Sequence, residues 1–455
     1  MDHVGPREAT LTRSPTTRNS LVDRNQSSGW FRRLDRPLSQ WWCALGWFVS
    51  TAIFVGMTRL VGGVTTGDAS ESVNTTWALA HGIPSCAYAP GNQFGLAYTG
   101  PLYPSLSGAL AALIRIGHGA PFPTRAQLGP HCSTAIMAMY QWSIRSHALV
   151  PTVQIGYVTW FLLMGGVVAL LRASGRGRCG WEPLALVIIA IAPPVSMCLH
   201  EYFHPQDLAA MGLVLAGIAC VRRGWWVWAG ILLGLAFTAQ QFALLAFAPL
   251  LVVAPRDHRT RFVGATVLSI AAIVGPLSAF ASTRAISVAL VGSGDSSGAN
   301  TLLGVLHPQG GLVLVLSRFV PIALAIVTAR WSLKRIGSGV LEPVPLIALV
   351  ATSLSYRLIF EVNLWGYYFM AVAVLLVILD VIRGRIRVLL LVWLALVAIA
   401  FCPTSDFGPA SPLWLPLWLW QLVLVPIAIA LAASPLMSRA SVRGARTGNP
   451  HLVRL

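Results

Sequence analysis

The stretch WWCALGWFVSTAIFVGMTRLVGG fills residues 41–63 and decides the fold class. A helix needs about 20 apolar residues to cross the core of a bilayer, and this run is long enough. Further apolar runs follow near residues 150–171, 183–200, 207–221, 225–254, 262–281, 312–329, 341–358, 366–382, 388–402 and 413–433. Only 10% of the residues are charged and the mean hydropathy is +0.69, whereas soluble domains carry about 25% charged residues. The sequence therefore predicts an all-α polytopic membrane protein without a separate soluble domain.

The run 225–254 is too long for a single span. Arginines flank it on both sides: Arg222, Arg223, Arg256, Arg259 and Arg261. If both flanks lie on the same side of the membrane, the run is a helical hairpin that turns near Gln240 and Gln241. The chain then has about twelve membrane helices, with both termini in the cytoplasm.

The basic residues give the orientation. A formal net charge of +17 would suggest a nucleic-acid partner in a soluble protein. Here the arginines form short clusters between apolar runs, and all but seven of the 32 basic residues fall on one side of the predicted membrane. The positive-inside rule makes that side cytoplasmic, so we expect a multi-pass protein of the inner (plasma) membrane that contacts anionic lipids and no nucleic acid.

Three regions follow from this topology. Residues 1–40 are polar and arginine-rich and predict a disordered cytoplasmic tail, residues 41–435 form the multi-span domain, and residues 436–455 form a second basic cytoplasmic tail. A long first external loop covers residues 64–149, and its apolar piece, residues 101–117, is expected to lie along the membrane interface.

Two cysteines, Cys86 and Cys132, share this external loop. Disulfides form in oxidising compartments, so we expect these two to pair. The alternative is two free thiols.

Two acids, Asp68 and Glu71, follow the first apolar run. Carboxylates at a membrane interface are costly unless they have a function, and a positioned carboxylate can accept a proton from a reacting hydroxyl. Asp68 is the preferred candidate base and Glu71 the second. The alternative for Asp68 is a helix N-cap before a helix predicted over residues 70–81.

A polar turn joins the third and fourth spans. Pro193 and Pro194 should kink or end the preceding helix. His200, Glu201 and His204 match the pattern H-E-x-x-H, which binds zinc when both histidines lie on one helix face. The neighbouring prolines leave little regular helix there, so an intramembrane zinc protease is a minor alternative and no metal site or cofactor is predicted. The alternative is a divalent ion held by Asp68, His204 and Asp207.

Polar side chains also interrupt two later apolar segments. Gln240 and Gln241 either bond between helices or line a cavity. Arg357 and Glu361 are four residues apart and could pair with each other on a helix. Alternatively, the planar guanidinium of Arg357 binds a phosphate. Tyr367 and Tyr368 could stack on a sugar or lie in an interfacial aromatic belt.

The order of several short motifs resembles a known family. An acid follows the first span, Tyr103-Pro104-Ser105 lies in the interfacial stretch, Phe203-His204-Pro205 lies between spans three and four, and GWWVWAGILLGLA fills residues 224–236. Together these resemble GT-C fold glycosyltransferases, in particular the actinobacterial polyprenol-phosphate-mannose-dependent α-mannosyltransferases of the cell envelope. The resemblance covers roughly residues 40–435.

The resemblance implies that a hexose, in this family mannose, moves from a polyprenyl-phosphate donor to an envelope glycolipid or polysaccharide on the outer face. Asp68 matches the position of the family's base, and Arg357 and His204 are the candidates for binding the donor phosphate. The remaining polar residues are candidates for substrate binding: Glu201, Asp207, Gln240, Gln241, Glu361, Tyr367 and Tyr368. A position that is often lysine in related enzymes is Gln240 or Gln241 here. The second function class is a transporter of a lipid or small solute, although the chain has no visible inverted repeat.

Overall fold

Among the residues that the structure describes, seven helices are long and apolar enough to cross a membrane, or eight if one bent pair counts as a single span. The computed structural model describes residues 33–60, 72, 75–80, 100–114, 138, 141–142, 145–146, 149–200, 203–279, 301–305, 312, 315–401 and 416–438. These residues form helices and turns, and they contain no β-strand longer than an isolated bridge. The prediction of an all-α polytopic membrane protein is confirmed.

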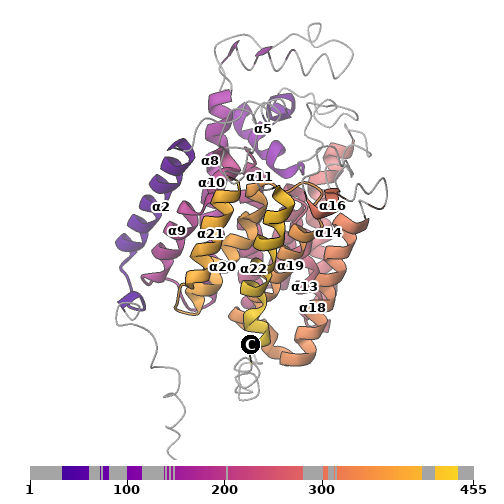
Figure 1. The fold of residues 1–455 in the computed structure, drawn as a ribbon. Coiled ribbons are helices and arrows are strands. Elements are labelled where there is room, and N and C mark those ends of the chain that lie inside the picture. The colour runs from indigo at the N-terminus through magenta and orange to yellow at the C-terminus, as the bar shows by residue number, and fades with distance from the viewer. Residues whose placement is uncertain are drawn as a thin grey trace, which may run out of the picture.

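The long helices run side by side in the bundle of Figure 1. They are α2 (Gln40–Leu60), α8 (Leu149–Ala173), α11 (Pro205–Arg222), α14 (Arg256–Ser278), α18 (Val320–Ile336) with its flanking turns η1 (Val315–Phe319) and η2 (Gly337–Leu341), α19 (Pro343–Phe360) and α22 (Leu417–Met437). The shorter apolar helices are α5 (Leu102–Ile114), α12 (Trp226–Ala239), α13 (Ala243–Val253), α20 (Met370–Ile382) after the turn η3 (Gly366–Phe369), and α21 (Val388–Ala400). The single turn α16 (Leu302–Val305) completes the set.

The bent pair consists of α9 (Trp181–Ile191) and α10 (Pro193–His200), whose axes differ by 62°. Pro193 and Pro194 stand at the bend and have no amide hydrogen to continue the helical ladder. The predicted kink is therefore confirmed.

The long apolar run 225–254 divides into α12 and α13. A Cβ on Gly230 would lie 2.4 Å from the carbonyl oxygen of Phe262, and one on Gly234 would lie 2.6 Å from that of Thr266. From the first contact to the second, the chain advances by four residues on both helices. Helices α12 and α14 therefore run parallel and in close contact. The helix between them, α13, must run in the opposite direction, and the predicted hairpin near Gln240 and Gln241 is confirmed.

Most of the arginine clusters lie at one end of the bundle. Arg222, at the end of α11, donates to the carbonyl of Leu341, and Arg335, at the end of α18, donates to that of Met437 at 2.9 Å. In the same way Arg176, between α8 and α9, donates to Ile382 at the end of α20. We call this the arginine-rich end. Clustering on one side agrees with the charge pattern predicted from the sequence.

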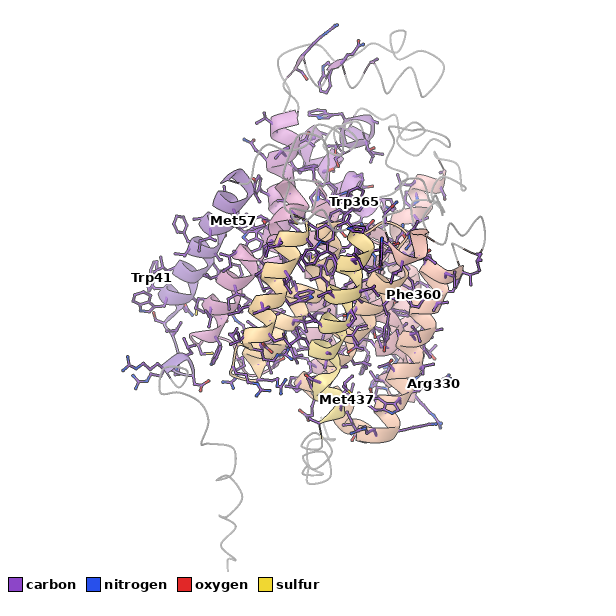
Figure 2. The ribbon with its side chains drawn as sticks, in the orientation of Figure 1. Trp41, Met57, Arg330, Phe360, Trp365 and Met437 are labelled. Carbon is purple, nitrogen blue, oxygen red and sulfur yellow. The ribbon has the colours of Figure 1, made fainter. Side chains whose placement is uncertain are left out.

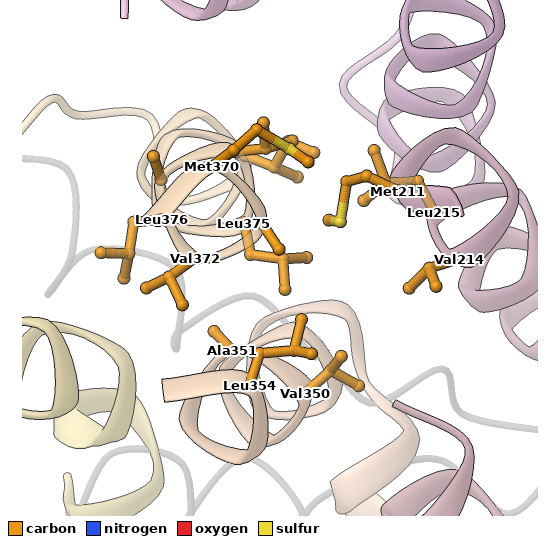
Figure 3. Packing of buried hydrophobic residues seen from close by; sticks show 14 of the residues in the cluster. Met211, Val214, Leu215, Val350, Ala351, Leu354, Met370, Val372, Leu375 and Leu376 are labelled. Carbon is orange, nitrogen blue, oxygen red and sulfur yellow. The ribbon is translucent and has the colours of Figure 1, made fainter. Parts of the chain in front are cut away.

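The core is built around α20, which is buried on every side from Met370 to Ile382. Its one charged residue, Asp380, is paired with Arg387, and every other residue is apolar. A helix with no polar face to expose is stable only inside the bundle. Figure 3 shows its side chains facing those of α11 and α19: Met211, Val214, Leu215, Val350, Ala351, Leu354, Met370, Val372, Leu375 and Leu376. This core fixes the relative positions of α11, α19 and α20, and the candidate site lies at the ends of α11 and α19 and in the turn η3 before α20.

Candidate functional site

Eight of the predicted site residues come together at the end of the bundle opposite the arginine-rich end. They are His204, Asp207, Gln240, Gln241, Arg357, Glu361, Tyr367 and Tyr368, and Figure 2 locates this end by Trp365, far from Met437. The remaining calls, Asp68, Glu71, Glu201 and the Cys86–Cys132 pair, lie outside the described residues. The four cysteines that the structure describes, Cys43, Cys179, Cys198 and Cys220, form no disulfide with one another.

The turn that carries His204 has an unusual backbone. Phe203 has a φ of +44°, a left-handed conformation that is uncommon for residues other than glycine. The His204 amide donates to the carbonyl of Cys198, and the Phe203 ring fills the space beside Gly156. Such conformations persist where the surroundings over-determine them, often at functional sites.

This turn also separates the two histidines of the H-E-x-x-H pattern. Helix α10 ends at His200 and α11 begins at Pro205, so His204 lies between the two helices. The pattern needs both histidines on one helix face to bind zinc. Within the described part of the chain, no group of three side chains could hold a metal ion.

His204 begins a chain of polar contacts that crosses to α12. Its Nδ1 atom lies 2.8 Å from the side-chain nitrogen of Gln206 and 3.6 Å from the carboxylate of Asp207. Gln240 donates to the same Asp207 oxygen at 3.2 Å. Asp207 and Gln240 are both buried, and the inter-helix bond considered for Gln240 is present. These contacts orient the His204 ring.

Aromatic rings continue the site toward Arg357. The ring of His204 stacks on Tyr367 with a centroid distance of 4.2 Å and an interplanar angle of 17°. Tyr368 stands perpendicular to Tyr367, and the guanidinium carbon of Arg357 lies 4.3 Å from the Tyr368 ring centroid. This distance is within the range of a cation–π interaction. His204 and Arg357 are thus joined through two tyrosines of η3.

Arg357 and Glu361 form the ion pair expected from their spacing. A second guanidinium, that of Arg318 in η1, lies 3.2 Å from Oε1 of Glu361 and 3.4 Å from its Oε2. Burial alone raises the pKa of Glu361, but Arg318 and Arg357 outweigh it, and the pKa lies below its ordinary value. Two guanidiniums thus converge on one buried carboxylate in this part of the site.

Arg318 was missed as a site residue by the sequence analysis. The signal was its position inside the apolar run 312–329, because an ionisable residue in a membrane segment points to a function or a buried partner.

An apolar cavity of 140 Å³ borders both arginines. Its walls come from α12, α13, η1, α18 and α19. Its lining includes Phe237, Phe242, Leu245, Phe319 and Ile322 with Gln241, Arg318 and Arg357. Gln241 therefore lines a cavity, as one of its two interpretations predicted. The arrangement suits a ligand that carries a negative group on an apolar chain.

A second set of hydrogen bonds holds the end of α19 in place. Thr301 donates to the carbonyls of Glu361 and Val362 at 2.6 and 2.7 Å. Gln421 of α22 donates to the carbonyl of Leu358 at 2.6 Å and accepts from the amide of Leu302 at 2.9 Å. These side chains satisfy carbonyls that the helix end leaves without an internal partner. They fix the position of Glu361 and hence of the two guanidiniums.

Comparison with known proteins assigns no family to the chain. No protein-family model matches the sequence, and no curated protein gives a significant match. The chemistry of the site therefore rests on the geometry of its own residues.

Proposed function

We propose that this protein is an integral membrane glycosyltransferase that takes a hexose from a polyprenyl-phosphate donor. The observation that carries the proposal is the pair Arg318 and Arg357, which share one carboxylate at the edge of an apolar cavity. Guanidinium groups match the geometry of phosphate oxygens. The apolar walls suit the first isoprene units of the donor. A soluble nucleotide sugar has no lipid chain that such apolar walls could bind.

The helix set supports a GT-C-like arrangement of about twelve membrane helices. Seven long helices and the bent pair are joined by four shorter apolar helices, α12, α13, α20 and α21. The hairpin of α12 and α13 returns the chain to the arginine-rich end. If that end is cytoplasmic by the positive-inside rule, the candidate site faces outward.

The reaction we propose is a single displacement. The acceptor hydroxyl forms a bond to C1 of the hexose while the bond between C1 and the phosphate oxygen breaks, and the electron pair leaves with the phosphate. Arg357 and Arg318 stabilise the charge on that leaving group, and His204 is a further donor. The hydroxyl proton passes to a carboxylate, for which Asp68 is the proposed base and Glu71 the second candidate.

The acceptor side of the site draws on the other polar residues. Tyr367 and Tyr368 offer ring faces of the kind on which sugars stack, and Asp207, Gln240 and Gln241 supply polar groups. Glu361 keeps the two guanidiniums in position, which makes it a positioning residue.

Lipid analysis of a strain that lacks this protein tests the proposal. We expect an envelope glycolipid or polysaccharide precursor to accumulate one hexose short, and the wild-type gene to restore the full-length product. An unchanged envelope glycan profile would contradict glycosyl transfer. Loss of solute uptake with an unchanged glycan profile would indicate a transporter.

A further inference from the structure

A second cavity lies at the arginine-rich end, away from the candidate site. It has a volume of 380 Å³ and lies between the start of α2 and the connection from α8 to α9. Its lining includes Leu38, Gln40, Ala44, Trp47, Arg172 and Arg178. One wall is apolar and the other is cationic, and neither contributes to the site described above.

The backbone of Arg178 is held in a conformation that is uncommon for arginine. Its φ is +56°. Its amide donates to the Glu182 carboxylate at 2.8 Å, and its carbonyl accepts from the amide of Leu38 at 2.8 Å. These two bonds fix the backbone from both sides. The side chain is exposed and has no ion pair or hydrogen bond with any described residue.

The charges around this cavity do not balance. Arg172 donates to both oxygens of Glu182, at 3.0 and 3.2 Å, and Arg176 pairs with Asp35. Both acids are thereby occupied by other arginines. The side chain of Arg178 has no carboxylate partner among the described residues, and it borders the cavity. A bound anion would complement it.

The apolar wall continues along α2. Trp41, Trp42 and Phe48 are exposed by 86%, 61% and 72% on this helix, and Ala44 and Trp47 line the cavity itself. Tryptophans are typical of the boundary between head groups and acyl chains. We propose that this cavity binds an anionic phospholipid of the bilayer, with its phosphate on Arg178 and Arg172 and an acyl chain along α2.

Native mass spectrometry of the detergent-purified protein with dihexanoyl-phosphatidylglycerol tests the site. Wild-type protein should bind this lipid in preference to dihexanoyl-phosphatidylcholine. Arg178→Gln should weaken phosphatidylglycerol binding by about fivefold, the effect of one arginine near an anionic surface. Equal binding by wild type and Arg178→Gln, or equal binding of the two lipids, would overturn the proposal.

Two further variants make the result specific. Ala44→Trp fills the cavity and leaves every charge in place, so it should reduce lipid binding as Arg178→Gln does, and it decides the question if Arg178→Gln does not purify. The matched control is Arg330→Gln, because Arg330 is an exposed arginine of α18 that lies across the bundle from Trp41 (Figure 2). It should bind lipid as the wild type does, and an equal loss there would contradict a defined site.

Two competing occupants are separable in the same experiment. Displacement of the lipid by millimolar inorganic phosphate alone would show a free-phosphate site and overturn the choice of a lipid. A shift to dimers on removal of lipid, abolished by Ala44→Trp, would assign the exposed side of α2 to a second copy and overturn it as well.

Discussion

Glu361 is the buried carboxylate that forms ion pairs with the guanidiniums of both Arg318 and Arg357. Buried charges are costly unless they are paired and hydrogen-bonded. Here the one carboxylate contacts both guanidiniums, so it stabilises the fold and also positions the two groups that we propose bind the donor phosphate.

Arg357 is expected to act mainly on the leaving group. Arg357→Gln should lower the rate of hexose transfer by about a hundredfold, as for the loss of one donor to a developing anion. Transfer measured with purified protein and a polyprenyl-phosphate hexose checks this. Arg330→Gln is the matched control and should keep the wild-type rate. A wild-type rate in Arg357→Gln would exclude the phosphate-binding role.

Glu361 should make the protein sensitive to acid. Its pKa lies below the ordinary value of 4.5 when the protein is folded, so its stabilising effect is complete above that value and is lost as pH falls through the folded-state pKa. We expect Glu361→Gln to melt at a lower temperature than the wild type at pH 7. Its melting temperature should also fall less than that of the wild type on acidification. Thermal unfolding from pH 7 to pH 3 measures both. Parallel curves for the two proteins would contradict the prediction.

Sequence reasoning identified part of this chemistry. The spacing of Arg357 and Glu361 predicted their pairing, because four residues make one helical turn. Arg318 comes from a separate helix, and only the tertiary packing brings it to the same carboxylate. The bond between Gln240 and Asp207 joins α12 to α11 in the same way, and no local pattern encodes it.

At the scale of elements, prolines explain the bend between two helices and glycines allow the close contacts between others. The pair Pro193-Pro194 predicted the bend between α9 and α10, since the signal is local. The lengths of α13 and α20 were less predictable, because burial inside the bundle, more than their own sequences, decides where these helices end. The close contact between α8 and α11 could not be predicted from the sequence either.

Two adjacent glycines of α8 test that contact. A Cβ on Gly166 would lie 2.3 Å from the carbonyl oxygen of Gly212, whereas a Cβ on Gly165 meets nothing within 4 Å. Gly166→Ala should therefore destabilise the protein by about 1 to 3 kcal/mol through overpacking. Gly165→Ala is the control and should be neutral or stabilising by up to about 1 kcal/mol, since alanine favours helices. Thermal melts in detergent compare them, and identical melting temperatures would contradict the close packing.

At the scale of the whole molecule, the arginine clusters lie at one end of the bundle and the candidate site lies at the other. The charge pattern predicted this separation, because it marks the loops on one side of the membrane. The sequence could not show how the helices pack around α20, which depends on contacts between distant segments. It is this packing that brings α11, α12 and α19 to the same site.

Cysteine labelling tests the orientation. In a background without the native cysteines, Leu106→Cys on α5 should react in intact cells with a maleimide that does not cross membranes. Ser338→Cys in η2, at the arginine-rich end, should react only after lysis. Both positions are exposed in the structure. The reverse pattern would place the candidate site in the cytoplasm.

The most direct measurement of the central claim is acceptor-dependent release of polyprenyl phosphate by the purified protein in nanodiscs. The account predicts one polyprenyl phosphate released for each hexose transferred, and loss of both products in Asp68→Asn at normal expression and monodispersity. Absence of release from folded wild-type protein supplied with polyprenyl-phosphate mannose and envelope lipid acceptors, or undiminished release from Asp68→Asn, would contradict it.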